Sequence, residues 1–284
     1  MKRNILILSI VILFVAGCSA GESPLKESPT IAPPTMTPLP LKPTVIPTTE
    51  PTATSTPRPT VDLELVLTPK ITAEYELDYI MLKTSDNLQI LAKKYGEGDL
   101  AVILAHQGTI GANQRDWDPF ARMIAQRGYT AVTLDFRGYG HSKGDLTQKY
   151  YLIRDMRAVI DYLKGEGYER FVCIGASMGG TTCMRAAVEY DLLGMVVIGS
   201  LYTQGEPTQV TEEELAALTI PKLFITTEND GYGVPEQIKS MYQVSQEPKQ
   251  LRIFPGEVHG TQMFNQPYAD EFTALLLAFL ESVR

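Results

Sequence analysis

Three side chains in the second half of this sequence, Ser177, Asp230 and His259, are of the types that nucleophilic catalysis uses. A serine hydroxyl attacks well only when a base takes its proton, and the base needs an acid to fix its tautomer and orientation. We expect His259 to be the base and Asp230 to be the acid, with Glu228 or a carboxylate elsewhere as the alternative acid.

Ser177 is predicted to lie at a sharp turn between a strand and a helix. Residues 171–174 are apolar and predict a buried strand, and residues 181–190 continue with helical spacing. A strained turn at this place lifts the serine hydroxyl clear of the sheet edge. Gly175 and Gly179 remove side chains that would collide where the strand and the helix close up.

Apolar runs that alternate with amphipathic segments predict the elements that must hold these residues. The predicted strands cover residues 75–82, 88–94, 100–105, 130–134, 171–174, 192–198, 223–227 and 250–254. The predicted helices end at Gly128 and Gly165 or cover residues 181–190, 212–218, 235–244 and 269–283. The first two strands form an antiparallel hairpin. The later ones need crossovers, which predicts an α/β fold with a mostly parallel sheet, helices on both faces and function at the carboxyl ends of the strands.

The other residues of reactive type are predicted to serve the structure. Trp117 is expected in the core, and Arg137 is expected to organise loops rather than to hold a substrate. Cys173 and Cys183 flank the turn; an exported chain can form disulfides, but their places inside a strand and a helix predict two buried thiols. Two further histidines are expected to hydrogen-bond their own loops, namely His106 and His141.

Four segments carry a family resemblance: residues 175–179, the loop 135–142, Asp230 with the following residues 234–235, and the loop 256–260. Together they resemble the α/β-hydrolase superfamily, and the resemblance covers about residues 75–284. It implies the α/β-hydrolase fold and the chain order of nucleophile, acid and histidine seen above.

The resemblance also implies two backbone donors for a carbonyl oxygen that becomes negatively charged. One donor is the Met178 amide, and the second comes from the loop after the third strand, where relatives carry His-Gly followed by the donor residue. Residues 106–108 read His-Gln-Gly, so a glutamine replaces the family glycine. Counting positions assigns the second donor to Gly108; a gap in the alignment would assign it to Gln107.

Larger relatives insert a cap domain at a place where this chain has only the short segment 201–222. We therefore predict no cap domain and an open pocket. Its walls are expected to be the loops 108–113, 201–206 and 263–267.

Residues 1–17 predict a lipoprotein signal peptide, because basic residues precede a short apolar run and small residues close it before Cys18. That ending resembles a bacterial lipobox, which implies cleavage before Cys18 and acyl chains such as palmitate as a firm membrane anchor. The alternative is a plain secretory peptide with a chance cysteine. Residues 18–60, rich in proline, threonine and serine, predict a disordered tether. Residues 61–284 are predicted to form the hydrolase domain.

The 284-residue chain has a formal charge of -8 and no basic run after its first few residues, so nucleic acid is not an expected partner. No cysteine or histidine cluster has metal-ligand spacing, and no phosphate-binding glycine loop occurs, so no metal or other cofactor is expected. The sequence does not indicate an oligomeric state.

The sequence as a whole predicts a serine hydrolase that is lipid-anchored to a bacterial cell membrane and faces its extracytoplasmic side. Its substrate is expected to be a small molecule or an acyl ester, hydrolysed through an acyl-enzyme. Two alternatives stay open: an amide or peptide hydrolase with the same triad, and a non-catalytic binding module on a hydrolase scaffold.

Overall fold

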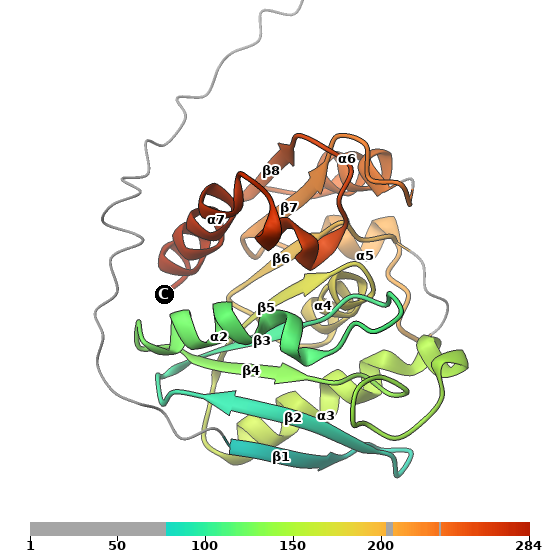
Figure 1. The fold of residues 1–284 in the computed structure, drawn as a ribbon, viewed down its shortest axis with the longest axis vertical. Helices are drawn as coiled ribbons and strands as arrows, with labels where there is room; N and C mark the ends of the chain where they lie inside the picture. The colour runs from blue at the N-terminus through green and yellow to red at the C-terminus, as the bar shows by residue number, and fades with distance from the viewer. Residues whose placement is uncertain (1–77, 203–206, 233) are drawn as a thin grey trace, which may run out of the picture. The chain divides into compact units, whose positions relative to one another are not determined.

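Figure 1 shows the computed structural model, which describes residues 78–202, 207–232 and 234–284. The predicted signal peptide, tether and start of the hydrolase domain, which fall on residues 1–77, lie outside the described residues. Within these ranges the strands are β1 (Asp78–Lys83), β2 (Gln89–Tyr95), β3 (Leu100–Ala105), β4 (Thr130–Leu134), β5 (Arg170–Ala176), β6 (Gly194–Ile198), β7 (Lys222–Thr227) and β8 (Lys249–Phe254).

These strands form one sheet in the order β1-β2-β4-β3-β5-β6-β7-β8. β1 pairs with β2 and β2 with β4 in antiparallel fashion, and every later pair of neighbours is parallel. The predicted hairpin and the mostly parallel sheet are therefore confirmed. Since β5 lies between β3 and β6, the turn at Ser177 opens at the middle of the edge where the parallel strands end.

Helices cover both faces of the sheet (Figure 1). One face packs against α2 (Asp118–Ala125) and α7 (Ala269–Ser282), and the other packs against α3 (Leu152–Gly165), α4 (Met178–Glu189), α5 (Glu212–Ala217) and α6 (Val234–Val244). Short 3-10 helices complete the described part: η1 (Gln114–Trp117), η2 (Leu146–Tyr151) and η3 (Gly260–Asn265). None of the described helices combines the length and the apolar character that crossing a membrane requires.

The central strand β3 shows why the sheet needs a layer of helices on each side. All its side chains are buried, and successive residues of a strand point to opposite faces. Ile103 belongs to the apolar cluster with α3 and α4, whereas Val102 belongs to the cluster with α2 and α7. A strand that is apolar on both faces is stable only when both are covered.

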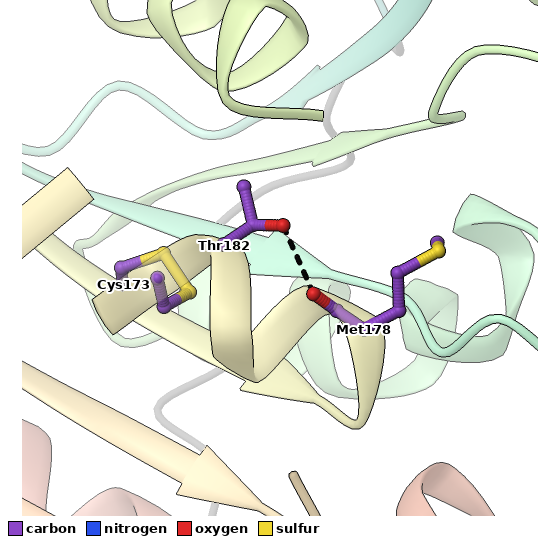
Figure 2. The surroundings of a disulfide bond; sticks show 4 residues. Cys173, Met178 and Thr182 are labelled. Atoms are coloured by element: carbon purple, nitrogen blue, oxygen red, sulfur yellow. Dashed lines mark hydrogen bonds between the residues drawn. A yellow bond between two sulfur atoms is a disulfide. The ribbon is translucent and has the colours of Figure 1, made fainter. Parts of the chain in front are cut away.

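The structure corrects the prediction for the two cysteines near the turn. Cys173 on β5 and Cys183 on α4 form a disulfide, with their Cα atoms 5.5 Å apart (Figure 2). The expectation of two thiols treated strand and helix as separate elements. The turn at Ser177 folds α4 back along β5, so positions that flank it come within the Cα separation that a disulfide spans. Both cysteines are fully buried.

Trp117 lies in the core as predicted, fully buried between Phe120 and Phe264. The bounds of α4 differ from the sequence prediction, because it begins at Met178 rather than at Thr181. The turn leads into the helix without any intervening loop.

Candidate active site

The backbone at Ser177 is strained. Its φ is 50° and its ψ is −117°, a combination that residues with a side chain rarely adopt. A Cβ at Gly175 would lie 2.3 Å from Gly179 O, and a Cβ at Gly179 would lie 2.3 Å from Ala105 O. Both glycines therefore allow the backbone segments around the turn to pack closely, as the sequence pattern predicted. The Ser177 amide donates a hydrogen bond of 2.7 Å to Ile198 O, which ties the turn to β6.

Asp230 and His259 come together at the carboxyl ends of β7 and β8. Asp230 Oδ2 lies 2.7 Å from His259 Nδ1, and the two side chains are 1% and 6% exposed, respectively. A carboxylate can only accept a hydrogen bond, so Nδ1 carries the proton and Nε2 is left free to accept another. Tyr232 N donates to the second oxygen, Oδ1, over 3.2 Å, which fixes the plane of the carboxylate.

Ser177 and His259 line one cavity of about 850 Å³, a volume typical of sites for small molecules. Proton transfer between them needs a hydrogen bond from the Ser177 hydroxyl to the His259 imidazole. Among the described residues this bond is not formed; such contacts often tighten only when a substrate binds. The Tyr232 ring lies against the imidazole, with the ring centroids 4.6 Å apart. This arrangement of hydroxyl, imidazole and buried carboxylate is suited to nucleophilic attack with proton transfer.

The two backbone groups suggested as oxyanion donors lie beside the serine. Met178 and Gly108 line the same cavity as Ser177, and a Cβ at Gly108 would be 3.1 Å from Met178 Sδ. Tyr139 donates a hydrogen bond of 3.0 Å from its hydroxyl to Gly108 O, and Thr182 Oγ1 donates to Met178 O over 2.9 Å (Figure 2).

The other candidate donor, Gln107, does not line the cavity of Ser177. Its residue lines a separate cavity of about 540 Å³, together with Thr261 and Phe264. This placement favours Gly108 over Gln107 as the second donor.

The walls of the larger cavity differ in part from the sequence prediction. The loop at Gly108 and the residue Leu201 line it as expected. The segment 263–267 does not, because η3 turns away and packs Phe264 against Trp117. Three tyrosines that the prediction did not include stand in the wall, namely Tyr139, Tyr150 and Tyr232.

His106 is structural, as expected. Its Nε2 accepts a hydrogen bond of 3.0 Å from Phe136 N, and its Nδ1 lies 2.7 Å from Gln107 O. Accepting at Nε2 leaves Nδ1 as the donor, so the ring is held neutral. His141 differs from the prediction. The contact with its loop comes from its backbone N, which donates to Asp135 Oδ2 over 2.8 Å, and not from its imidazole. His141 is exposed.

The buried state of His106 predicts a loss of stability in acid. Burial lowers its pKa from 6.5 to about 4, so below pH 6.5 the unfolded chain binds a proton that the folded chain does not. The contribution of His106 to the free energy of unfolding has its full value above pH 6.5 and decreases as the pH falls to 4. The decrease caused by His106 is about 3 kcal/mol.

Urea unfolding at pH 7 and pH 4 tests this prediction. We expect the free energy of unfolding to fall more steeply for the native chain than for His106→Asn, by about 3 kcal/mol over that interval. An equal pH dependence in the two proteins would contradict it.

Arg137 organises loops, as predicted. Its guanidinium is buried and donates to both oxygens of Asp86 and to Asp155 Oδ1, over 2.7 Å for the Nη2 contact with Asp155. Its backbone N donates to Asp155 Oδ2. These bonds join the hairpin turn between β1 and β2 to the loop after β4 and to α3, which leaves the guanidinium committed to the structure.

Sequence reasoning missed the side chains that surround the proposed catalytic groups. The Tyr139 hydroxyl contacts Gly108 and the Tyr232 ring contacts His259. The Gln107 carboxamide contacts Thr261, two residues after His259. Tyr139 and Gln107 fall inside segments that the motifs marked, but the motif positions do not specify where those side chains point. In the described residues, no group of three or more His, Cys, Asp or Glu side chains is arranged to hold a metal ion.

Two family models match this chain. Residues 101–200 match the model described as alpha/beta hydrolase fold. Residues 200–279 match the model described as PhoPQ-activated pathogenicity-related protein. The first match contains the turn at Ser177, and the second contains both Asp230 and His259.

Among curated proteins, the chain is similar to the serine hydrolase BPHL of Homo sapiens, with 30% identity over 133 residues. That match covers 45% of this chain and 45% of the human protein, so the chain spans less than half the length of this relative. The uncharacterized protein YfhR of Salmonella typhi is 22% identical, over 66% of this chain and 73% of that protein.

Solved structures share the fold at low identity. The esterase Pf2001 of Pyrococcus furiosus has a TM-score of 0.62 and 18% identity, and the match covers 73% of this chain and 93% of that one. The esterase domain of a Rhodothermus marinus protein has a TM-score of 0.61 and 16% identity, over 74% of this chain and 100% of that one. These likenesses support the α/β-hydrolase fold that the motifs indicated.

Proposed function

We propose that this chain, which has the α/β-hydrolase fold, is a serine hydrolase that cleaves carboxylic esters through an acyl-enzyme. Ser177 attacks the carbonyl carbon, and His259 takes its proton and returns it to the leaving alcohol. Asp230 orients His259, and the amides of Met178 and Gly108 stabilise the oxyanion. The observation that carries this proposal is the buried carboxylate 2.7 Å from an imidazole that faces the cavity of the serine.

The cavity suits a substrate of modest size, and its lining includes the cationic side chain of Lys149 as well as aromatic residues. Tyr139, Tyr150 and Tyr232 contribute aromatic walls, and Tyr232 is 63% exposed at the mouth. A short acyl group, or the accessible end of a larger molecule, fits such an open site. The same groups can cleave an amide, which differs in that the leaving nitrogen must be protonated before it departs.

Covalent trapping tests the proposal. A fluorophosphonate is expected to label the native chain once, on Ser177, as located by mass spectrometry of the digested adduct. A panel of p-nitrophenyl esters of graded acyl length, run beside aminoacyl p-nitroanilides, then measures the preference between esters and amides. A native chain that is neither labelled nor active on any ester would be a binding module, and the proposal would fail.

We also propose that the enzyme is held at the extracytoplasmic face of a bacterial membrane by lipid on Cys18. The support lies in the sequence, where an apolar run ends in small residues directly before this cysteine. Changing Cys18 to alanine is expected to move the protein from the membrane fraction to the soluble fraction, because acyl chains supply the anchoring energy. An unchanged distribution on fractionation would count against the anchor.

A further inference from the structure

The side chain of Gln107 connects two loops that lie far apart in the sequence. Its Oε1 accepts hydrogen bonds from Thr261 N, over 2.8 Å, and from Thr261 Oγ1, over 3.2 Å. Its Nε2 donates to Thr109 Oγ1 over 3.0 Å. Gln107 is 3% exposed, and its two bonds to Thr261 are buried, so bulk water competes little with them.

Each end of this connection adjoins a group of the proposed catalytic machinery. Thr109 directly follows Gly108, and Thr261 comes two residues after His259. Gly260 has a φ of 57°, and a Cβ there would lie 2.0 Å from Gln107 Oε1. The histidine loop therefore approaches the carboxamide as closely as a glycine allows.

We infer that Gln107 is a positioning residue, and this inference rests on the proposed serine hydrolase function. The carboxamide fixes the distance between the loop that supplies the Gly108 donor and the loop that supplies His259. The glycine that the family resemblance led us to expect at this place has no side chain with which to make the connection. The replacement thus adds a direct brace between the oxyanion loop and the base.

The brace matters because the two groups must act on the same substrate at the same moment. A shift of about 1 Å in a catalytic group can cost about 10²-fold in rate. Without the carboxamide, Thr261 N loses its acceptor, and a buried donor left unpaired favours rearrangement of the loop. A brace of this kind affects the chemical step more than it affects substrate binding, so its loss should appear in kcat.

Gln107→Ala and Gln114→Ala form a matched pair. Gln114 is also 3% exposed, and its Oε1 accepts a hydrogen bond of 3.0 Å from Thr133 Oγ1. Both variants lose a buried carboxamide, but only the first loses the brace. For p-nitrophenyl acetate, we expect Gln107→Ala to lower kcat by about 10²-fold with KM within about threefold. Gln114→Ala should keep kcat within about twofold of the native value. Equal kcat values for the two variants would overturn the inference.

Thr109→Val is a milder variant. Its combination with Gln107→Ala gives a comparison of kcat values that a general loss of stability does not explain. Thr109→Val removes the acceptor of Nε2 and leaves the Thr261 end in place, so we expect a loss in kcat of about 10-fold. Combined with Gln107→Ala, it should cost much less than the product of the two separate losses, since both changes break the same connection. Losses that simply multiply would overturn the inference, even if Gln107→Ala alone folds poorly.

The native chain and Ser177→Ala are measured in the same series, together with circular dichroism of each variant. If Ser177→Ala hydrolyses the ester as fast as the native chain, the proposed function itself fails. If only Ser177→Ala loses activity while Gln107→Ala matches the native chain, the proposed function stands and the positioning role of Gln107 fails.

Discussion

Replacement of Ser177 with alanine is expected to lower kcat for p-nitrophenyl acetate by about 10⁴- to 10⁶-fold, with the fold unchanged. The change removes the attacking oxygen. It leaves the φ of 50° at this position in place, and an alanine there bears the same backbone strain as the serine. The residual rate would come from the oxyanion donors and from substrate binding. Steady-state kinetics measure the loss, and circular dichroism checks the fold.

Ser200→Ala is the control for this variant. Ser200 is buried near the turn, and its Oγ donates to Ile198 O over 3.2 Å. Removing that hydroxyl should cost about 1 kcal/mol of stability and leave kcat within about twofold. A Ser177→Ala protein that retains a tenth or more of the native kcat would rule out the serine as the nucleophile.

The turn at Ser177 could be predicted from the sequence because its requirements are local. An apolar run, a serine between Gly175 and Gly179, and a helical pattern define the element without any knowledge of distant contacts. The structure gives each glycine a specific neighbour, in one case the backbone of β3 at Ala105. The parallel sheet could be predicted for a related reason, since alternating strands and helices leave few other topologies.

Contacts between distant segments are what the sequence could not provide. The disulfide of Cys173 and Cys183 depends on the angle at which α4 leaves the turn. The brace made by Gln107 joins residues 154 positions apart, and the family pattern placed a glycine there. The wall formed by Tyr232 depends on how the loop after β7 folds over the imidazole. Each feature follows from the relative placement of whole elements, which composition and periodicity do not specify.

The choice of the acid illustrates the same limit and leads to a second large effect. The sequence offered Asp230 and Glu228 as alternatives on one short loop. In the structure Asp230 is buried with its Oδ2 2.7 Å from His259 Nδ1, whereas Glu228 is exposed. A buried, charged acceptor is the stronger means of fixing the tautomer of a histidine. The geometry therefore favours Asp230 over Glu228 as the proposed acid.

Asp230→Asn is expected to lower kcat at pH 7 by about 10⁴-fold, because the neutral amide no longer favours the tautomer with its proton on Nδ1 and does not stabilise the imidazolium that forms. Glu228→Gln removes the same charge two residues away and should leave kcat within about twofold. Measuring both variants with the same ester separates the role of the buried partner from that of charge on the loop. If the two losses were equal, or if Glu228→Gln were the more damaging, the acid would have to be reassigned, and the buried pair at His259 would be a structural contact alone.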